Sequence, residues 1–215
     1  LQADGEMKAA NIYHINPPIF QDATAASQLA YAHRENDFDD YEKEVLLPHR
    51  MSHLGPAAAK ADVNGDGLED MYLGGAAGQA GTLFLQQADE TLVEAPSQPW
   101  KQDAASEDID AHFFDADGDG DQDLYVTSGG NDFPEGSPAL ADRLYINQGN
   151  GQFAKSNKIP VVKTSGGVAV SGDVDNDGDL DLFSANGNGD ELILQYPLLM
   201  ENDGKGNFTD IGFSD

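Results

Sequence analysis

Short apolar segments alternate with short acidic segments along most of this chain, and the alternation recurs three times at a spacing of about 55 residues. The apolar segment after each acidic one is aliphatic and aromatic, which is typical of a buried β-strand. These segments are Met71–Leu73, Leu124–Val126 and Leu182–Ser184. A further apolar strand follows each after a glycine-containing turn, at Leu83–Leu85, Leu144–Ile146 and Leu198–Met200. Helical periodicity is weak, and the pattern predicts one short helix over about residues 39–47.

Two more strands complete each predicted unit. A segment of small residues precedes each acidic run, with Ala58, Ala111 and Ala169 at the same place, so we expect these strands to be crowded against their neighbours. In the second and third units, Asn147–Phe153 and Asn202–Phe208 have the asparagines and glycines of tight hairpins, and their aromatic residue opens a fourth strand. Turn chemistry explains these hairpins better than extra metal sites do. Four strands in each unit predict an all-β protein built of four-stranded antiparallel β-propeller blades.

The acidic segments share the nine-residue pattern DxDxDGxxD, with one asparagine in place of an aspartate. Side chains at alternate positions of such a loop can point inward and supply the oxygen ligands that calcium prefers, while position seven can offer its backbone carbonyl. The candidate ligands are Asp62, Asn64, Asp66, Leu68 and Asp70 in the first loop, Asp115, Asp117, Asp119, Asp121 and Asp123 in the second, and Asp173, Asp175, Asp177, Asp179 and Asp181 in the third. We therefore expect about three bound Ca²⁺ ions.

Other interpretations of these loops are less favoured. Zinc and copper fit poorly because the loops contain no histidine or cysteine, and magnesium prefers stricter octahedral geometry. Solvated Asp-Gly turns remain an alternative, although three copies in register argue against it. EF-hand and dockerin-type loops need an acidic residue at position twelve, where this chain has Leu73, Val126 and Ser184.

The order of these elements resembles the FG-GAP/VCBS repeat over about residues 50–212. That family builds the seven-bladed, calcium-binding propeller of integrin α-subunits and of many secreted bacterial proteins, and this chain is more similar to the bacterial surface type. Phe20–Thr24 resembles the FxDxT outer strand that often opens such a propeller. The first unit departs from the family pattern, because Asn64 replaces an aspartate and Gln86–Glu90 replaces the hairpin.

The repeats divide the chain into an N-terminal segment, residues 1–50, with the outer strand and a charged insertion, and three blades over about residues 51–105, 106–163 and 164–215. Three blades are too few to close a propeller, so we expect the chain to be part of a larger one. Two alternatives are a fourth blade completed by Asn11–Ile15, Ile19–Thr24 and Leu29–His33, and self-association through open blade edges.

Charge and composition narrow the expected partners and location. The formal net charge is −28, which disfavours nucleic acid and anionic membranes as partners, and no apolar run predicts membrane insertion. The chain has no cysteine, so calcium rather than disulfides would stabilise it. Weak calcium sites fill only where calcium is near millimolar, which predicts a secreted or cell-surface protein.

The expected function is adhesion or binding of an extracellular protein or glycan, without catalysis. The five histidines are scattered, at His14, His33, His49, His53 and His112, and no nucleophile, phosphate-loop or zinc-protease motif is present. His49 and His53 could form a metal pair, and His112 is better explained as a packed side chain. Tyr41, Trp100 and Phe133 could stack on sugars, although ordinary packing explains each, and the exposed loop 133–138 is a candidate ligand surface. The alternative is a propeller within a polysaccharide-degrading enzyme.

Overall fold

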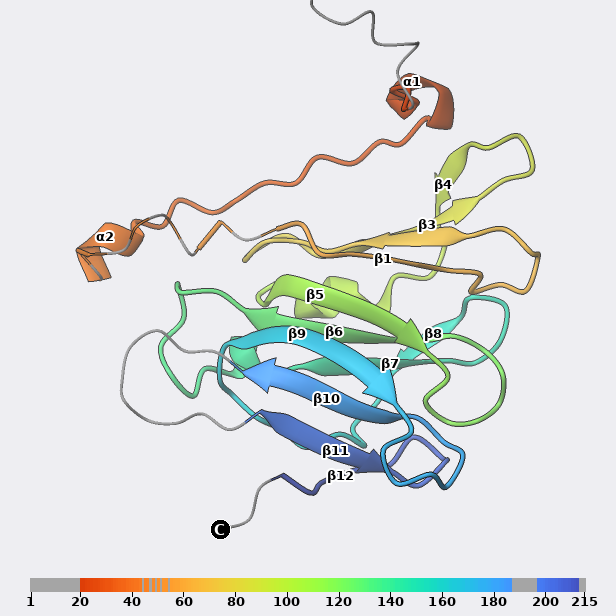
Figure 1. Cartoon of the computed structure of the whole chain (residues 1–215). Helices are drawn as coiled ribbons and strands as arrows, with labels where there is room; N and C mark the ends of the chain where they lie inside the picture. Colours follow the sequence, from red (N-terminus) through yellow and green to blue (C-terminus); the bar gives the residue numbers. More distant parts are fainter. Residues whose placement is uncertain are drawn as a thin grey trace, which may run out of the picture.

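The computed structural model describes residues 20–186, except 44, 47, 49, 51 and 54, and residues 197–212. Three four-stranded antiparallel sheets follow one another along the chain, each an up-and-down meander (Figure 1). The strands are β1 (Ala58–Ala61), β2 (Asp70–Leu73), β3 (Thr82–Gln86) and β4 (Leu92–Glu94); β5 (Glu107–Phe114), β6 (Asp123–Gly129), β7 (Arg143–Asn147) and β8 (Phe153–Lys155); and β9 (Gly166–Gly172), β10 (Asp181–Asn186), β11 (Leu198–Asn202) and β12 (Phe208–Asp210). The all-β prediction of four-stranded blades is confirmed.

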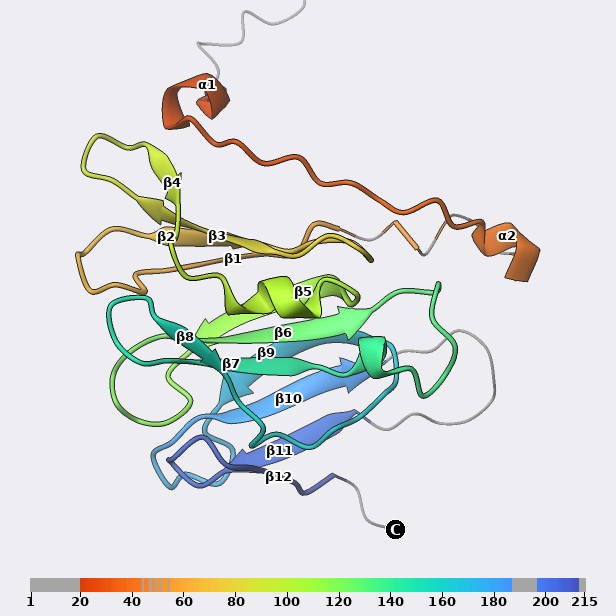
Figure 2. The ribbon, with the colours of Figure 1, turned by 180° about the vertical axis from the view of Figure 1, so that it is seen from behind.

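The sheets are arranged like successive blades. The first strands lie side by side, with β5 between β1 and β9, and the described sheets do not close into a ring (Figures 1 and 2). The described helices are short. The helices α1 (Thr24–Ser27) and α2 (Asp40–Lys43) precede the first sheet, the 3₁₀ helix η1 (Pro99–Asp103) connects the first sheet to the second, and the 3₁₀ helix η2 (Pro138–Leu140) lies between β6 and β7. None of the helices in the described part of the chain has the length and apolar character needed to cross a membrane.

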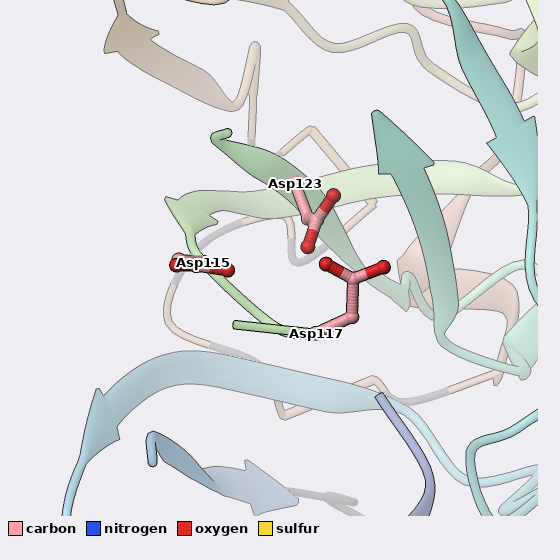
Figure 3. Close-up of side chains that lie close together, drawn as sticks. All are labelled: Asp115, Asp117 and Asp123. Atoms are coloured by element: carbon pink, nitrogen blue, oxygen red, sulfur yellow. The ribbon is translucent and has the colours of Figure 1, made fainter. Parts of the chain in front are cut away.

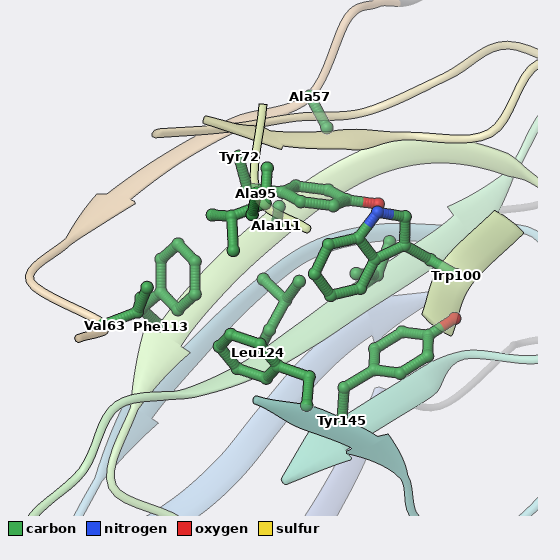
Figure 4. Packing of buried hydrophobic residues seen from close by; sticks show 12 residues of the cluster. Ala57, Val63, Tyr72, Ala95, Trp100, Ala111, Phe113, Leu124 and Tyr145 are labelled. Atoms are coloured by element: carbon green, nitrogen blue, oxygen red, sulfur yellow. The ribbon is translucent and has the colours of Figure 1, made fainter. Parts of the chain in front are cut away.

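Aromatic side chains fill the space between the first two sheets (Figure 4). Trp100, carried by η1, is 1% exposed, and its ring lies edge-on to Tyr72 and Tyr145 at centroid distances of 5.2 and 5.5 Å. The favoured interpretation of Trp100 as a packed side chain is therefore confirmed over the sugar-stacking alternative, because burial against two aromatic rings stabilises it in the core. A second cluster, which includes Phe114, Leu182 and Met200, fills the space between the second and third sheets.

The predicted crowding of the small-residue strands is confirmed for two of the three alanines. Ala111 is 9% exposed and Ala169 is 4% exposed, and they belong to the first and second core clusters respectively. Ala58 is exposed, which contradicts the prediction for the first unit. Ala111 and Ala169 face the preceding sheet, and among the described residues no sheet precedes the one that contains Ala58.

An extended segment, residues 28–39, runs beside the first sheet from α1 to α2 (Figures 1 and 2), and we call it the strap. The Tyr31 hydroxyl donates to the carbonyl of Gly74, and its ring lies 6.4 Å from that of Phe84. The Arg34 amide donates to Gln79 Oε1 (2.7 Å), and Gln79 Nε2 donates to the carbonyl of Ala32 (2.9 Å). The strap is thereby fixed to the blade by side-chain contacts.

Three expectations for the N-terminal region change. Phe20–Thr24 is not an outer strand, because Phe20 is 88% exposed and α1 begins at Thr24; alanine-rich sequence favours a helix turn where no strand is available for pairing. Residues 29–33 form no strand, and residues 11–15 and 19, the other parts of a suggested fourth blade, lie outside the described residues. The helix predicted over residues 39–47 is observed as α2 alone, with residues 44 and 47 outside the described set.

Candidate metal sites

Each acidic loop connects the first and second strands of its sheet, and the aspartate at position nine fixes its shape. The Asp123 side chain is fully buried and accepts the amide of Ala116 (2.8 Å) and the amide of Asn147 (2.7 Å). Asp70 and Asp181 each accept the same two kinds of amide, one from loop position two and one from the end of the third strand. Position nine therefore joins the loop to the sheet, whether or not it also binds an ion.

The aspartates at positions one and five accept backbone amides of their own loop and so hold it in a tight turn. In the second loop, Asp115 accepts the amides of Gly118 (2.7 Å) and Gly120 (3.0 Å), and Gly120 adopts a φ of 93°, which only glycine reaches without strain. Position five accepts the amide of position seven in every loop: Asp66 from Leu68, Asp119 from Asp121, and Asp177 from Asp179. Backbone hydrogen bonds thus bring carboxylates of like charge close together.

The second and third loops each gather three carboxylates. Asp115, Asp117 and Asp123 offer oxygens that all lie within 4.8 Å of one another (Figure 3), and Asp173, Asp175 and Asp177 do the same. In the described part of the chain these are the only such trios of acidic, histidine or cysteine side chains. The first loop has no trio, because Asn64 stands at position three and its Nδ2 donates to Asp66 Oδ2 (3.1 Å).

The donor set fits a hard divalent cation. Asp117 Oδ1 and Asp179 Oδ1 are buried and have no hydrogen-bond partner among the described residues. Burial together with neighbouring carboxylates raises the pKa of Asp117 and raises that of Asp179 to about 6, and burial raises the pKa of Asp123 to about 7 against the amides that it accepts. A cation held by the carboxylate trio of each loop would relieve this repulsion, and in the second loop it would also satisfy Asp117 Oδ1. Calcium accepts carboxylate and carbonyl oxygens in flexible geometry.

Asparagines of the two hairpins connect neighbouring blades, a role that the sequence analysis missed. Asn147 Nδ2 donates to the carbonyl of Val63 in the first loop (2.8 Å), and Asn202 Nδ2 donates to the carbonyl of Ala116 in the second loop (2.8 Å). Each hairpin therefore supports the acidic loop of the blade before it. The signal was the asparagine that opens both hairpins, which we interpreted only as a turn residue.

The histidines considered as candidate site residues differ in their surroundings. His112 Nε2 lies 2.8 Å from Ser171 Oγ and its ring stacks on Phe114, so His112 is a packed, hydrogen-bonded side chain, and burial lowers its pKa. His53 is exposed, while His14 and His49 lie outside the described residues, so the suggested His49–His53 metal pair stays a prediction.

Comparison with known proteins identifies the repeat. A family model, the FG-GAP-like repeat, matches residues 62–126 and again residues 115–184, which together make up more than half of the chain. No curated protein matches the sequence. Each match begins at position one of an acidic loop and continues to the second strand of the next sheet, so the matched repeat includes the loops and the strands that position them. The chain belongs to the FG-GAP-like repeat family.

Proposed function

We propose that this chain is a calcium-stabilised β-propeller module of a secreted or cell-surface protein, and that it binds a protein or glycan partner rather than catalysing a reaction. The observation that carries the calcium assignment is the pair of buried, unpartnered oxygens, Asp117 Oδ1 and Asp179 Oδ1, each within a loop of crowded carboxylates. Buried polar atoms are almost always satisfied in native proteins, so an ion is the simplest partner for them.

Calcium in the loops would act as a structural stabiliser. An ion that binds only the folded state at a hundredfold excess over its Kd stabilises that state by about 2.7 kcal/mol. Extracellular modules bind calcium with dissociation constants in the 0.1–1 mM range, which supports a location outside the cytosol. At calcium concentrations one to ten times the Kd, each ion would contribute roughly 0.4–1.4 kcal/mol, so two or three ions would add a useful part of the 5–15 kcal/mol that is typical of domain stability.

Thermal unfolding and isothermal titration, each in millimolar calcium and in EDTA, test this assignment. We expect about three bound ions and a rise in Tm of roughly 5–15 °C, because each kcal/mol corresponds to roughly 2–4 °C in a domain of this size. Magnesium at the same concentration is the control and should give a smaller shift. A protein that binds no calcium and unfolds at the same temperature in both buffers would contradict the proposal.

One exposed region supports a binding role. The loop after β6 and the segment around α2 border a common hollow, lined among others by Phe38, Glu42 and Phe133. Tyr41, on α2, is 39% exposed, so aromatic and acidic groups are accessible on adjacent segments. Aromatic faces and hydrogen-bonding groups on loops are typical of glycan and protein recognition. An array of glycans and extracellular proteins, probed with the wild type and with residues 133–138 replaced by a glycine-serine linker, tests this surface; binding that the replacement leaves unchanged would exclude it.

The contacts of His112 support a role without catalysis. His112 and the Ser171 hydroxyl form a Ser–His pair. The Asp110 carboxylate, which lies near His112, accepts the backbone amide of Ala169 (2.8 Å). A nucleophilic serine needs a histidine that is oriented by a third group and a nearby oxyanion site. We therefore infer that these three side chains hold β5 and β9 together.

A further inference from the structure

A second group of acidic side chains lies at the opposite end of the second sheet from its DxDxDGxxD loop. Glu107 opens β5 and pairs with Gly129 at the end of β6, whereas Phe114 and Asp123 pair at the end that carries the loop. The Glu107 side chain is 1% exposed, and its Oε2 has no hydrogen-bond partner among the residues that the structure describes. A carboxylate so deeply buried is stable only when something neutralises it.

A neighbouring aspartate faces the same space. A Cβ built on Gly130 would lie 2.4 Å from Glu107 Oε2 and 3.2 Å from Asp132 Oδ1, so both oxygens border a space that the missing side chain keeps open. Asp132 Oδ1 is also buried and without a hydrogen-bond partner within the described set. Gly130 has a φ of 101°, so the backbone conformation and the space both require glycine here.

The strap brings another oxygen and a further negative charge to this end of the sheet. Asn36 Nδ2 donates to Asp132 Oδ2, which leaves Asn36 Oδ1 buried and unpartnered among the described residues. Glu35 accepts His33 Nε2 on Oε1 (2.8 Å), while its Oε2 is likewise buried without a described partner. The strap is the orange segment that reaches α2 in Figure 1. Unsatisfied oxygens of Glu107, Asp132 and Asn36 thus come from three separate segments of the chain.

The described ion pairs give these carboxylates no lysine or arginine. The nearby Arg143 guanidinium is engaged with Asp108 (2.7 Å), and Glu35 has only His33. Burial and the charges of Asp132 and Glu35 raise the pKa of Glu107 to about 8. A single proton on Glu107 could join its oxygen to Asp132, but it would leave the free oxygen of Asn36 unsatisfied. A divalent cation can bind carboxylate and amide oxygens at once.

We propose that Glu107, Asp132 and Asn36 form an additional divalent-cation site, which we call the strap site, and that its ion is calcium. The site is separate from the three DxDxDGxxD loops and joins the strap to the second blade. Amide and carboxylate oxygens without nitrogen or sulfur donors favour calcium or magnesium over zinc. Calcium tolerates the irregular arrangement that three independent segments impose.

Equilibrium dialysis with radioactive calcium tests the strap site in the complete chain. The Glu107→Gln and Asp132→Asn variants should each bind one ion fewer than the wild type, while Glu135→Gln, an exposed residue of the same loop, should bind the wild-type number. The proposal is overturned if Glu107→Gln and Asp132→Asn retain the full number of ions.

A crystal structure of the wild type in calcium gives an independent measurement that needs no variant to fold. The anomalous difference map should show a peak between Glu107 and Asp132 in addition to any peaks in the DxDxDGxxD loops. Peaks in the loops without one at the strap site would refute the strap site and leave the loop assignment intact. A strap-site peak with empty loops would do the reverse.

Discussion

The first and second acidic loops have the same nine-residue pattern but differ in how completely the chain satisfies them. In the first, Asp62 accepts the amides of Gly65 (2.8 Å) and Gly67 (2.7 Å), and Asn64 bonds to Asp66 through both its amide nitrogen and its amide oxygen. In the second loop, Asp117 replaces that asparagine, and one of its oxygens is buried without a described partner. With one amide in place of a carboxylate, the side chains of a loop can hydrogen-bond to one another. Three carboxylates repel one another, and a bound cation relieves that repulsion.

The loops also differ in what covers them. The residue at position two is Val63 in the first loop and Ala116 in the second, and these are 2% and 0% exposed because the hairpin asparagine of the next blade bonds to each. In the third loop the equivalent residue, Val174, is 51% exposed. The first two loops are thus supported by the blade that follows each of them, so their stability depends on the order of the blades.

The largest expected effect separates the structural role of position nine from ion binding. Replacing Asp123 with alanine leaves the buried amides of Ala116 and Asn147 without acceptors, which should destabilise the fold by about 2–4 kcal/mol. Because those bonds need no ion, the loss should appear in urea unfolding both with calcium and with EDTA. Asp117→Asn is the matched control and should lower stability only in calcium. If Asp123→Ala loses stability in calcium alone, position nine is mainly an ion ligand.

A smaller effect is expected from the contact between blades. Asn147→Ala removes the bond to the carbonyl of Val63 and the cap that its Oδ1 provides for the amide of Gly149 (3.1 Å), and should cost about 1–2 kcal/mol. Calcium affinity of the first loop should fall as well, because that loop loses its support. Gln148→Ala, one residue further along and exposed, is the control for removing a hairpin amide. Equal unfolding midpoints for the two variants would show that the hydrogen bond from Asn147 to Val63 contributes nothing to stability.

Local chemistry explains why the blades could be predicted from the sequence. Strand β6 begins at Asp123 because an apolar run follows an Asp-Gly loop, and the next apolar run forms its partner β7. Such features depend on residues close in sequence, so the pattern alone was sufficient for the strands, the loops and the all-β class. The fourth strand of the first unit, β4, formed even though the hairpin motif is absent there, because the turn before Thr91 is closed by Asp89.

The features that could not be predicted depend on residues distant in sequence. Trp100 lies between two sheets that its own segment connects, so its burial follows from how the blades stack. Asn36, Glu107 and Asp132 come together only because the strap crosses to the second blade, and no spacing in the sequence reveals such a meeting. The outer strand predicted for Phe20–Thr24 is not observed, because the short motif has no partner strand with which to pair.

Exchanging the residue at position three tests directly why the first two loops differ, and it should change calcium affinity with little effect on the fold itself. Asn64→Asp adds a carboxylate to the first loop and should tighten calcium there about tenfold, and Asp117→Asn should weaken the second loop by a similar factor, which corresponds to about 1.4 kcal/mol in each case. Titration calorimetry of the two variants and of the double exchange measures this. The double variant should restore the wild-type total affinity while reversing the order of the loops. If Asn64→Asp leaves the first site unchanged, the difference between the loops lies in the blade contacts and not in the charge at position three.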